Sequence, residues 1–323
     1  MATELHPQAE ALLHELSEGG VPPLYRQSTA KARETYLELT VSEGGESPEP
    51  VDRVNDTTFE GPNGPVSVRS YDPDSTVEGA RPTLLFFHGG GWVVGDLETH
   101  DLTARALANA ADCLVVAVEY RRAPEAPFPA PLEDCYGALD WLAGDPDLGF
   151  ETNVDVDPDR IAIGGDSAGG TLATGVALLA RARDGPAIAR QLLVYPVTDH
   201  AFETESYTEN ASGYFITRGD MERFWGAYLE TNQDGNHPYV SPLRAPDLTG
   251  LPPATVLTAG FDPLRDEGQA YADRLEDAGV PVSRLEYPDM IHGFLTMLTD
   301  PEWDRAHEAI GDLAADLRTA YDA

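Results

Sequence analysis

The sequence predicts an α/β fold, with a mostly parallel sheet of eight strands, helices on both faces and a helical cap. Three observations predict it. Short apolar runs, such as 84–87 and 114–118, alternate with longer segments of helical spacing, as they do in βαβ units. Residues 57–71 instead alternate apolar and polar side chains around a turn at 61–64, which indicates an antiparallel hairpin. A segment of more than fifty residues then interrupts the βα alternation before residue 253.

The elements follow in order along the chain. Two helices are predicted first, over residues 3–17 and 25–41, where leucine and tyrosine recur at helical spacing. After the hairpin, strands are predicted near 84–87, 114–118, 161–164, 191–195, 255–259 and 282–287. Helices are predicted near 99–110, 131–143, 168–183, 264–278 and 302–320. This alternation is typical of a parallel sheet that helices cover on both faces.

The long segment between residues 198 and 253 is rich in aromatic residues and contains a predicted helix over 217–229. Connections of this length inside an α/β repeat are usually functional, so we expect a lid or cap. A decorative insertion is the alternative.

The composition is strongly acidic, with 56 Asp and Glu against 21 Lys and Arg and a formal charge of −35 at pH 7. Such a chain repels phosphate backbones and anionic headgroups, which argues against nucleic-acid binding and electrostatic membrane association. Lys31 is the only lysine. This composition resembles that of halophile proteins, which work in salt that shortens the Debye length to about 3 Å at 1 M. An ordinary acidic cytosolic protein is the alternative.

The chain has neither a basic, apolar leader at its N-terminus nor a window approaching 18 apolar residues. We therefore expect no signal peptide, no membrane span and a cytoplasmic location. Cys113 and Cys135 are expected to be inert core thiols rather than a disulfide, and no Cys/His cluster indicates a zinc site.

A candidate nucleophile lies between a predicted strand and a predicted helix, in the pattern Gly165-x-Ser167-x-Gly169. This is the context of a nucleophile elbow, a turn so sharp that Cβ atoms at the glycine positions would collide with backbone. The serine hydroxyl needs a base to accept its proton and donors to stabilise the oxyanion that forms.

A candidate oxyanion loop follows the strand 84–87, where His88 precedes Gly89, Gly90 and Gly91 and then Trp92. Three glycines let backbone N–H groups approach a ligand atom without interference from side chains. A flexible loop or a phosphate cradle is the alternative, and the acidic composition argues against the cradle.

A candidate base and acid follow later strands. Of the eight histidines, His292 follows a predicted strand at the edge where sites form in such sheets. Asp262 follows the strand before it and is the expected orienting acid, with Asp266, inside the next helix, as the other candidate. The chain order Ser167, Asp262, His292 is that of α/β-hydrolases.

Together these motifs resemble those of the bacterial hormone-sensitive-lipase family of carboxylesterases, in its GDSAGG subgroup. The resemblance runs from about residue 54 to the C-terminus and rests on the motifs His88-Gly-Gly-Gly-Trp92, Glu119-Tyr-Arg-Arg-Ala-Pro-Glu125, Gly165-Asp-Ser-Ala-Gly-Gly170, Asp262-Pro-Leu-Arg-Asp-Glu267 and Ile291-His-Gly-Phe294. Two positions depart from the family pattern: Arg122 stands where leucine is usual, and Thr171 where asparagine is frequent.

The resemblance implies a role for each site residue. Ser167 would be the nucleophile, Asp262 the acid and His292 the base, and the backbone N–H groups of Gly89, Gly90 and Ala168 would form the oxyanion hole.

It also implies a cap built from helices in residues 1–50 and from the insertion 199–252. The α/β-hydrolase core would then comprise residues 51–198 and 253–323.

The sequence thus predicts a carboxylesterase that hydrolyses short- to medium-chain esters of small molecules and needs no metal or organic cofactor. Trp92, Tyr214, Phe215 and Phe294 are candidates to line its substrate pocket, or else are ordinary core aromatics.

An amidase or deacetylase with the same triad is an alternative. A non-catalytic module like the plant gibberellin receptors, which lack the catalytic histidine, is disfavoured because His292 is present. The oligomeric state stays open between a monomer and a homodimer.

Overall fold

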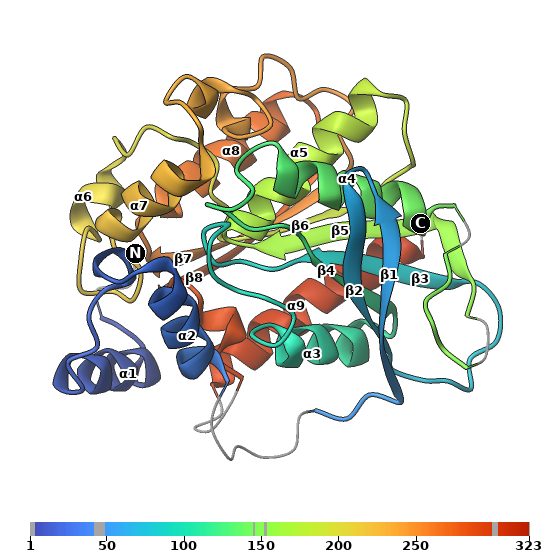
Figure 1. Ribbon diagram of the computed structural model, residues 1–323, viewed down its shortest axis with the longest axis horizontal. Coiled ribbons are helices and arrows are strands. Elements are labelled where there is room, and N and C mark those ends of the chain that lie inside the picture. Colours follow the sequence, from blue (N-terminus) through green and yellow to red (C-terminus); the bar gives the residue numbers. More distant parts are fainter. Residues whose placement is uncertain (1–3, 42–48, 145, 152–153, 299–302, 323) are drawn as a thin grey trace.

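A computed structural model describes residues 4–41, 49–144, 146–151, 154–298 and 303–322. Its centre is a twisted eight-stranded sheet with the strand order β1-β2-β4-β3-β5-β6-β7-β8 (Figure 1). The strands are β1 (Arg53–Gly61), β2 (Gly64–Asp72), β3 (Arg81–Phe87), β4 (Leu114–Glu119), β5 (Val156–Asp166), β6 (Gln191–Val194), β7 (Ala254–Phe261) and β8 (Val282–Ile291). β2 runs antiparallel to β1 and β4, whereas β3 to β8 pair in parallel, which confirms the predicted sheet.

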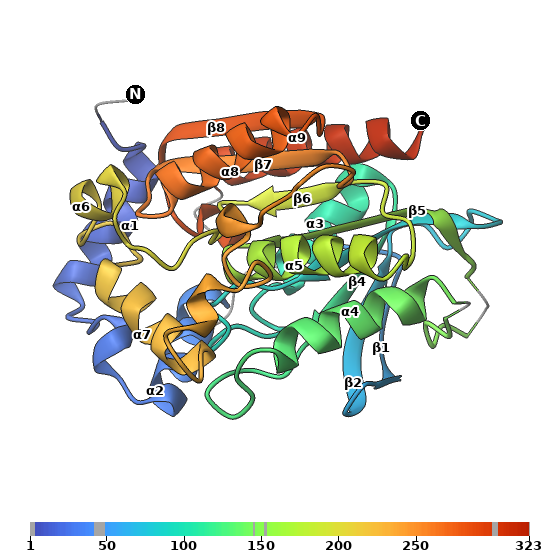
Figure 2. The ribbon, with the colours of Figure 1, turned by 90° about the horizontal axis from the view of Figure 1, so that it is seen from above.

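Helices cover both faces of the sheet (Figures 1 and 2). One face carries α3 (Asp101–Ala111) and α9 (Asp304–Tyr321). The other face carries α4 (Ala130–Leu142), α5 (Ala168–Ala182) and α8 (Arg265–Asp277).

The apolar run of β3 has no polar alternation because both of its faces are buried. Leu85 and Phe87 pack in the hydrophobic cluster under α4 and α5. Leu84 and Phe86 point the other way, into the cluster under α3 and α9. The run therefore lies between two hydrophobic cores, and the loop after Phe87 starts from a strand that is packed on both faces.

The remaining helices gather at the edge of the sheet where the parallel strands end (Figures 1 and 2). They are α1 (Pro7–Glu18), α2 (Thr29–Thr40), α6 (Glu205–Glu209) and α7 (Arg218–Tyr228). The N-terminal and insertion segments touch directly, since the N–H of Tyr25 donates to Asp220 of α7 at 2.7 Å. The two parts of the predicted cap thus lie over the same edge.

The predicted helix 25–41 is divided in the structure. Residues Leu24–Arg26 form a single 3₁₀ turn, and α2 begins only at Thr29. Ser28 separates them because its hydroxyl accepts the N–H of Lys31, the usual bond of an N-cap residue.

Two further features concern expectations from the sequence. Cys113 and Cys135 are both buried and free, as predicted for core thiols. In the part of the chain that the structure describes, no helix has both the length and the apolar character needed to cross a bilayer.

The acidic surface leads to a prediction about salt. At −35, lowering the ionic strength from 1 M to 0.01 M lengthens the Debye length from about 3 Å to about 30 Å, so carboxylate repulsion spreads across the molecule. Native stability is typically only about 5–15 kcal/mol. We expect the protein to unfold or lose activity in dilute buffer and to recover in molar KCl. Circular dichroism and activity titrated against salt test this, and indifference down to about 10 mM would contradict it.

Candidate active site

Ser167 lies at the sharp turn between β5 and α5, with backbone angles φ 54° and ψ −118°. A left-handed φ is unusual for a residue with a side chain and indicates local strain. The turn brings the backbone against the end of β3, so a Cβ on Gly169 would lie 1.9 Å from the carbonyl oxygen of Phe87, and one on Gly165 would lie 2.3 Å from it. This is the physical reason for the two glycines of the elbow.

The side chains of Ser167, His292 and Asp262 form one continuous hydrogen-bonded array. The Nε2 atom of His292 is 2.9 Å from the Ser167 hydroxyl, and its Nδ1 atom is 2.7 Å from Oδ2 of Asp262. With Nδ1 protonated and donating to the carboxylate, Nε2 is the free acceptor that faces the hydroxyl.

Asp262 is itself held in place. Its side chain is fully buried directly after β7, and its second oxygen accepts the N–H of Leu264 at 2.8 Å. His292 follows β8, and its ring packs on Tyr195 with the ring centroids 4.6 Å apart. Both residues therefore sit on the ends of neighbouring parallel strands.

The other candidate acid, Asp266, points elsewhere. It accepts the N–H of Ser206 at 2.7 Å and a bond from its neighbour Arg265 at 2.8 Å. Burial alone would raise the pKa of Asp266, but Arg265 holds it below its usual value. Asp262, not Asp266, is the carboxylate beside His292.

The glycine loop after β3 requires one correction. The N–H of Gly89 donates to Oδ1 of Asp166 at 2.8 Å, so it is already engaged and is wrong as an oxyanion donor. Gly90 and Gly91 instead line the cavity at Ser167. Gly91 has φ 58°, and a Cβ there would lie 2.2 Å from the ring of Phe224, so a side chain at this position would collide with the wall of the cavity.

Asp166 and His100 form a buried pair that no sequence motif indicated. Oδ1 of Asp166 lies 3.1 Å from Nε2 of His100, beneath the glycine loop. Burial by itself would raise the pKa of Asp166, but His100 outweighs it and lowers the pKa below its ordinary value. Asp166 directly precedes the nucleophile, so its carboxylate ties the glycine loop to the nucleophile elbow.

His88 is a neutral, structural histidine. Burial, and then the neighbouring His100, lower the pKa of His88 to about 3. Its Nδ1 lies 2.8 Å from the carbonyl oxygen of Gly89, and its ring stacks on Tyr120 with centroids 4.1 Å apart. His88 thus fixes the start of the loop without facing the cavity.

A cavity of about 230 Å³ opens above Ser167 and His292. Its walls come from three parts of the chain: the sheet edge, the N-terminal segment and the insertion. The N-terminal segment contributes Leu13, Leu16, Val21, Leu24, Tyr36 and Leu39. The insertion contributes Gly213, Phe215, Ile216, Thr217, Asp220 and Phe224. The cavity is mainly apolar, with the hydroxyl and imidazole at its base.

Of the four aromatic residues predicted to line the pocket, Phe215 alone does so. Trp92 has φ 62°, is fully buried and stacks on Tyr228 with ring centroids 4.3 Å apart. Phe294 is equally buried in the opposite core, and Tyr214 packs on Phe261. The pocket assignments of Trp92, Tyr214 and Phe294 are therefore wrong.

A family model described as the α/β-hydrolase fold matches residues 84–296. The chain belongs to this family. Carboxylic ester hydrolase LipN of Mycobacterium tuberculosis is 42% identical over 249 residues, which cover 76% of this chain and 65% of LipN. The chain thus spans slightly less than two thirds of that relative. Carboxylesterase NlhH of the same species is 40% identical over 262 residues, which cover 80% of this chain and 79% of NlhH.

A solved structure of an ester hydrolase agrees with this assignment. Ester-hydrolase EH1AB1 from the metagenome of Lake Arreo, solved in complex with a derivative of bipyridine phosphonate, superposes with a TM-score of 0.91 at 39% identity. The superposition covers 99% of this chain and 100% of that one. The predicted fold and the resemblance to the hormone-sensitive-lipase family are confirmed.

Proposed function

We propose that this α/β-hydrolase is a carboxylesterase that forms an acyl-enzyme on Ser167. The observation that carries the proposal is the unbroken array Ser167–His292–Asp262, with bonds of 2.9 and 2.7 Å, at the base of an apolar cavity. The relatives named carboxylesterases and ester hydrolases support the same reaction class.

The reaction follows from the array. Ser167 Oγ attacks the ester carbonyl while Nε2 of His292 takes the hydroxyl proton. The tetrahedral intermediate collapses, the C–O bond to the alcohol breaks, and His292 returns the proton to the leaving alkoxide oxygen. Water then attacks the acyl-enzyme and gives a proton to His292. The second tetrahedral intermediate collapses, the C–O bond to Ser167 breaks, and His292 returns the proton to Oγ of Ser167 as the acid leaves. Asp262 holds the imidazole tautomer and stabilises the imidazolium in both halves.

We assign stabilisation of the oxyanion to the backbone N–H groups of Gly90, Gly91 and Ala168. Gly90 and Gly91 line the cavity beside Ser167, and Ala168 begins α5 directly after it. The N-terminus of a helix carries positive partial charge, so an N–H there stabilises a developing oxyanion.

The cap is assigned to residues 1–50 and 199–252, because described residues of both segments line the cavity. The 2.7 Å bond from Tyr25 to Asp220 joins these two parts. The cap excludes bulk water from the triad and limits the room for the acyl chain.

The cavity size predicts short to medium acyl preference. At about 230 Å³ it is smaller than the roughly 300–1,000 Å³ of sites for drug-sized ligands. We expect kcat/KM over p-nitrophenyl esters to peak at a short or medium acyl chain. A p-nitroanilide with the best acyl group is the control, and we expect it to react far more slowly. A rate maximum on long-chain triglyceride emulsions would contradict the chain-length prediction, and faster anilide cleavage would favour an amidase.

A further inference from the structure

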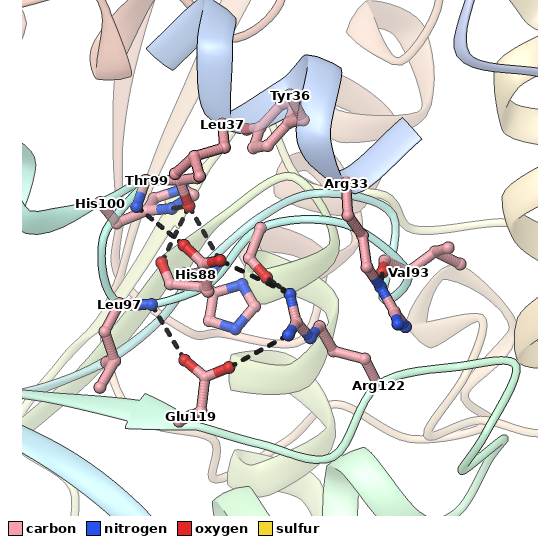
Figure 3. A network of polar contacts seen from close by, with 12 residues as sticks. Arg33, Tyr36, Leu37, His88, Val93, Leu97, Thr99, His100, Glu119 and Arg122 are labelled. Carbon is pink, nitrogen blue, oxygen red and sulfur yellow. Dashed lines mark hydrogen bonds and ion pairs between the residues drawn. The ribbon is translucent and has the colours of Figure 1, made fainter. Parts of the chain in front are cut away.

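We propose that Arg33 and Arg122 are positioning residues for the oxyanion hole. Each guanidinium holds a backbone carbonyl of the segment 89–100, which carries Gly90 and Gly91. Figure 3 shows Arg33 beside Val93, and Arg122 beside Glu119. The inference rests on the proposed esterase function and extends it to residues outside the cavity.

Arg33 reaches the segment from α2 in the N-terminal region. Its Nε donates to the carbonyl of Val93 at 2.8 Å, and its Nη2 donates to the carbonyl of Ala123 at 3.0 Å. Two further bonds, of 2.8 and 2.7 Å, form a bidentate pair with Glu125. Val93 in turn donates its N–H to the carbonyl of Gly90 at 3.1 Å. The residue that Arg33 holds is therefore hydrogen-bonded to Gly90, an assigned oxyanion donor.

Arg122 reaches the same segment from the loop after β4, where the family pattern has leucine. It donates to the carbonyl of Gly95 and lies 3.5 Å from Glu119, which accepts the N–H of Leu97 at 2.9 Å. The ion pair therefore binds one carbonyl and one N–H of a single turn. Gly95 packs on Gly89, since a Cβ on Gly95 would lie 2.3 Å from the carbonyl oxygen of Gly89.

Side-chain contacts connect this turn to Asp166, the residue before the nucleophile. Asp96 and Thr99 exchange bonds of 2.8 and 2.9 Å, and the Thr99 hydroxyl lies 2.9 Å from Nδ1 of His100. His100 then contacts Asp166, which accepts the N–H of Gly89. The two arginines and the His100–Asp166 pair thus hold the segment at three separate points.

Glycine-rich backbone needs such anchors. Gly90, Gly91 and Gly95 have φ of 103°, 58° and 81° and carry no side chains that could pack to fix the loop. A planar guanidinium fork binds two acceptors in fixed geometry, which a single ammonium does not. Loss of either fork should let the loop relax, which moves the N–H groups away from the position of the oxyanion.

An oxyanion exists only in the transition state, so a displaced donor lowers kcat more than it raises KM. Removal of one oxyanion donor costs about 10²–10³ in kcat, and a displaced donor should lose part of that, about tenfold to a hundredfold. We expect this loss in Arg33→Ala and in Arg122→Leu, with KM for a p-nitrophenyl ester nearly unchanged. Arg122→Lys keeps the charge and should recover part of the rate.

Inhibitor binding separates positioning from simple destabilisation. A trifluoromethyl ketone forms an oxyanion adduct with the serine, so its affinity should fall in parallel with kcat. The corresponding alcohol forms no adduct, and its affinity should stay at the wild-type level. The matched control is Arg274→Leu, which removes an arginine of α8 that binds the carbonyls of Leu243 and Ala245 rather than any carbonyl of the segment 89–100. It should lower Tm without lowering kcat.

The outcomes are distinct. Wild-type kcat in Arg33→Ala or Arg122→Leu would overturn the assignment of that arginine. Equal losses of affinity for the ketone and the alcohol would overturn it as well. If Arg122→Leu does not fold, the same measurements on Arg122→Lys decide the assignment of Arg122. Absence of Ser167-dependent ester turnover in the unmodified chain would instead refute the proposed function, which the arginine variants do not test.

Discussion

Ser167→Ala is expected to lower kcat for p-nitrophenyl ester hydrolysis by about 10⁶-fold, the loss seen when a triad serine is removed from a serine hydrolase. The substitution takes away only Oγ, the atom 2.9 Å from Nε2 of His292. Alanine has the same Cβ as serine, so the left-handed φ of 54° at the elbow is no harder to adopt. The fold should therefore persist while the acyl-enzyme cannot form.

Circular dichroism and Tm establish that the Ser167→Ala protein is folded before its rate is measured. Ser67→Ala is a suitable control, because Ser67 is exposed on β2 and should retain wild-type kcat. Turnover by folded Ser167→Ala within tenfold of wild type would refute the assignment of the nucleophile.

Asp262→Asn is expected to lower kcat by about 10⁴-fold. The amide that replaces the carboxylate can donate to Nδ1 of His292, which favours the tautomer that protonates Nε2 and removes its ability to accept the Ser167 proton. Asp266→Asn is the matched control. Asp266 lies in the first turn of α8, shortly after Asp262, and contacts Ser206 and Arg265 rather than the imidazole.

The two variants should differ in kind. Asp266→Asn should change stability at most, because it weakens the contact between α8 and α6 while the triad stays intact. A larger loss of kcat at Asp266 than at Asp262 would contradict the geometry described above.

The triad could be predicted from sequence because its placement depends on strand ends. Ser167, Asp262 and His292 each follow a parallel strand, and parallel strands that pair in register end at one edge of the sheet. The apolar runs that mark these strands are buried on both faces and are therefore visible in the sequence.

The oxyanion donors and the pocket could not be predicted in the same way. A run of three glycines shows that backbone approaches closely, but the direction of each N–H depends on the partner it meets. Here Asp166 takes the N–H of Gly89. Trp92 likewise follows the loop directly, yet its stack on Tyr228 depends on where α7 packs.

The pair His100–Asp166 lay outside the sequence prediction for a related reason. The two residues are far apart along the chain, and nothing in the spacing of His100 distinguishes it from the other histidines. A buried acid beside the nucleophile, in Gly165-Asp166-Ser167, is the signal that could have prompted a search for its partner, because a buried carboxylate needs one.

The most direct test of the central claim is to trap the serine covalently. A p-nitrophenyl phosphonate ester should react once per chain, releasing one equivalent of p-nitrophenol and leaving a phosphonyl group on the nucleophile, and peptide mass spectrometry then locates that group. We predict a single adduct on Ser167, formed as ester turnover disappears and absent from Ser167→Ala. An adduct on another residue, or full loss of turnover with Ser167 unmodified, would contradict the account.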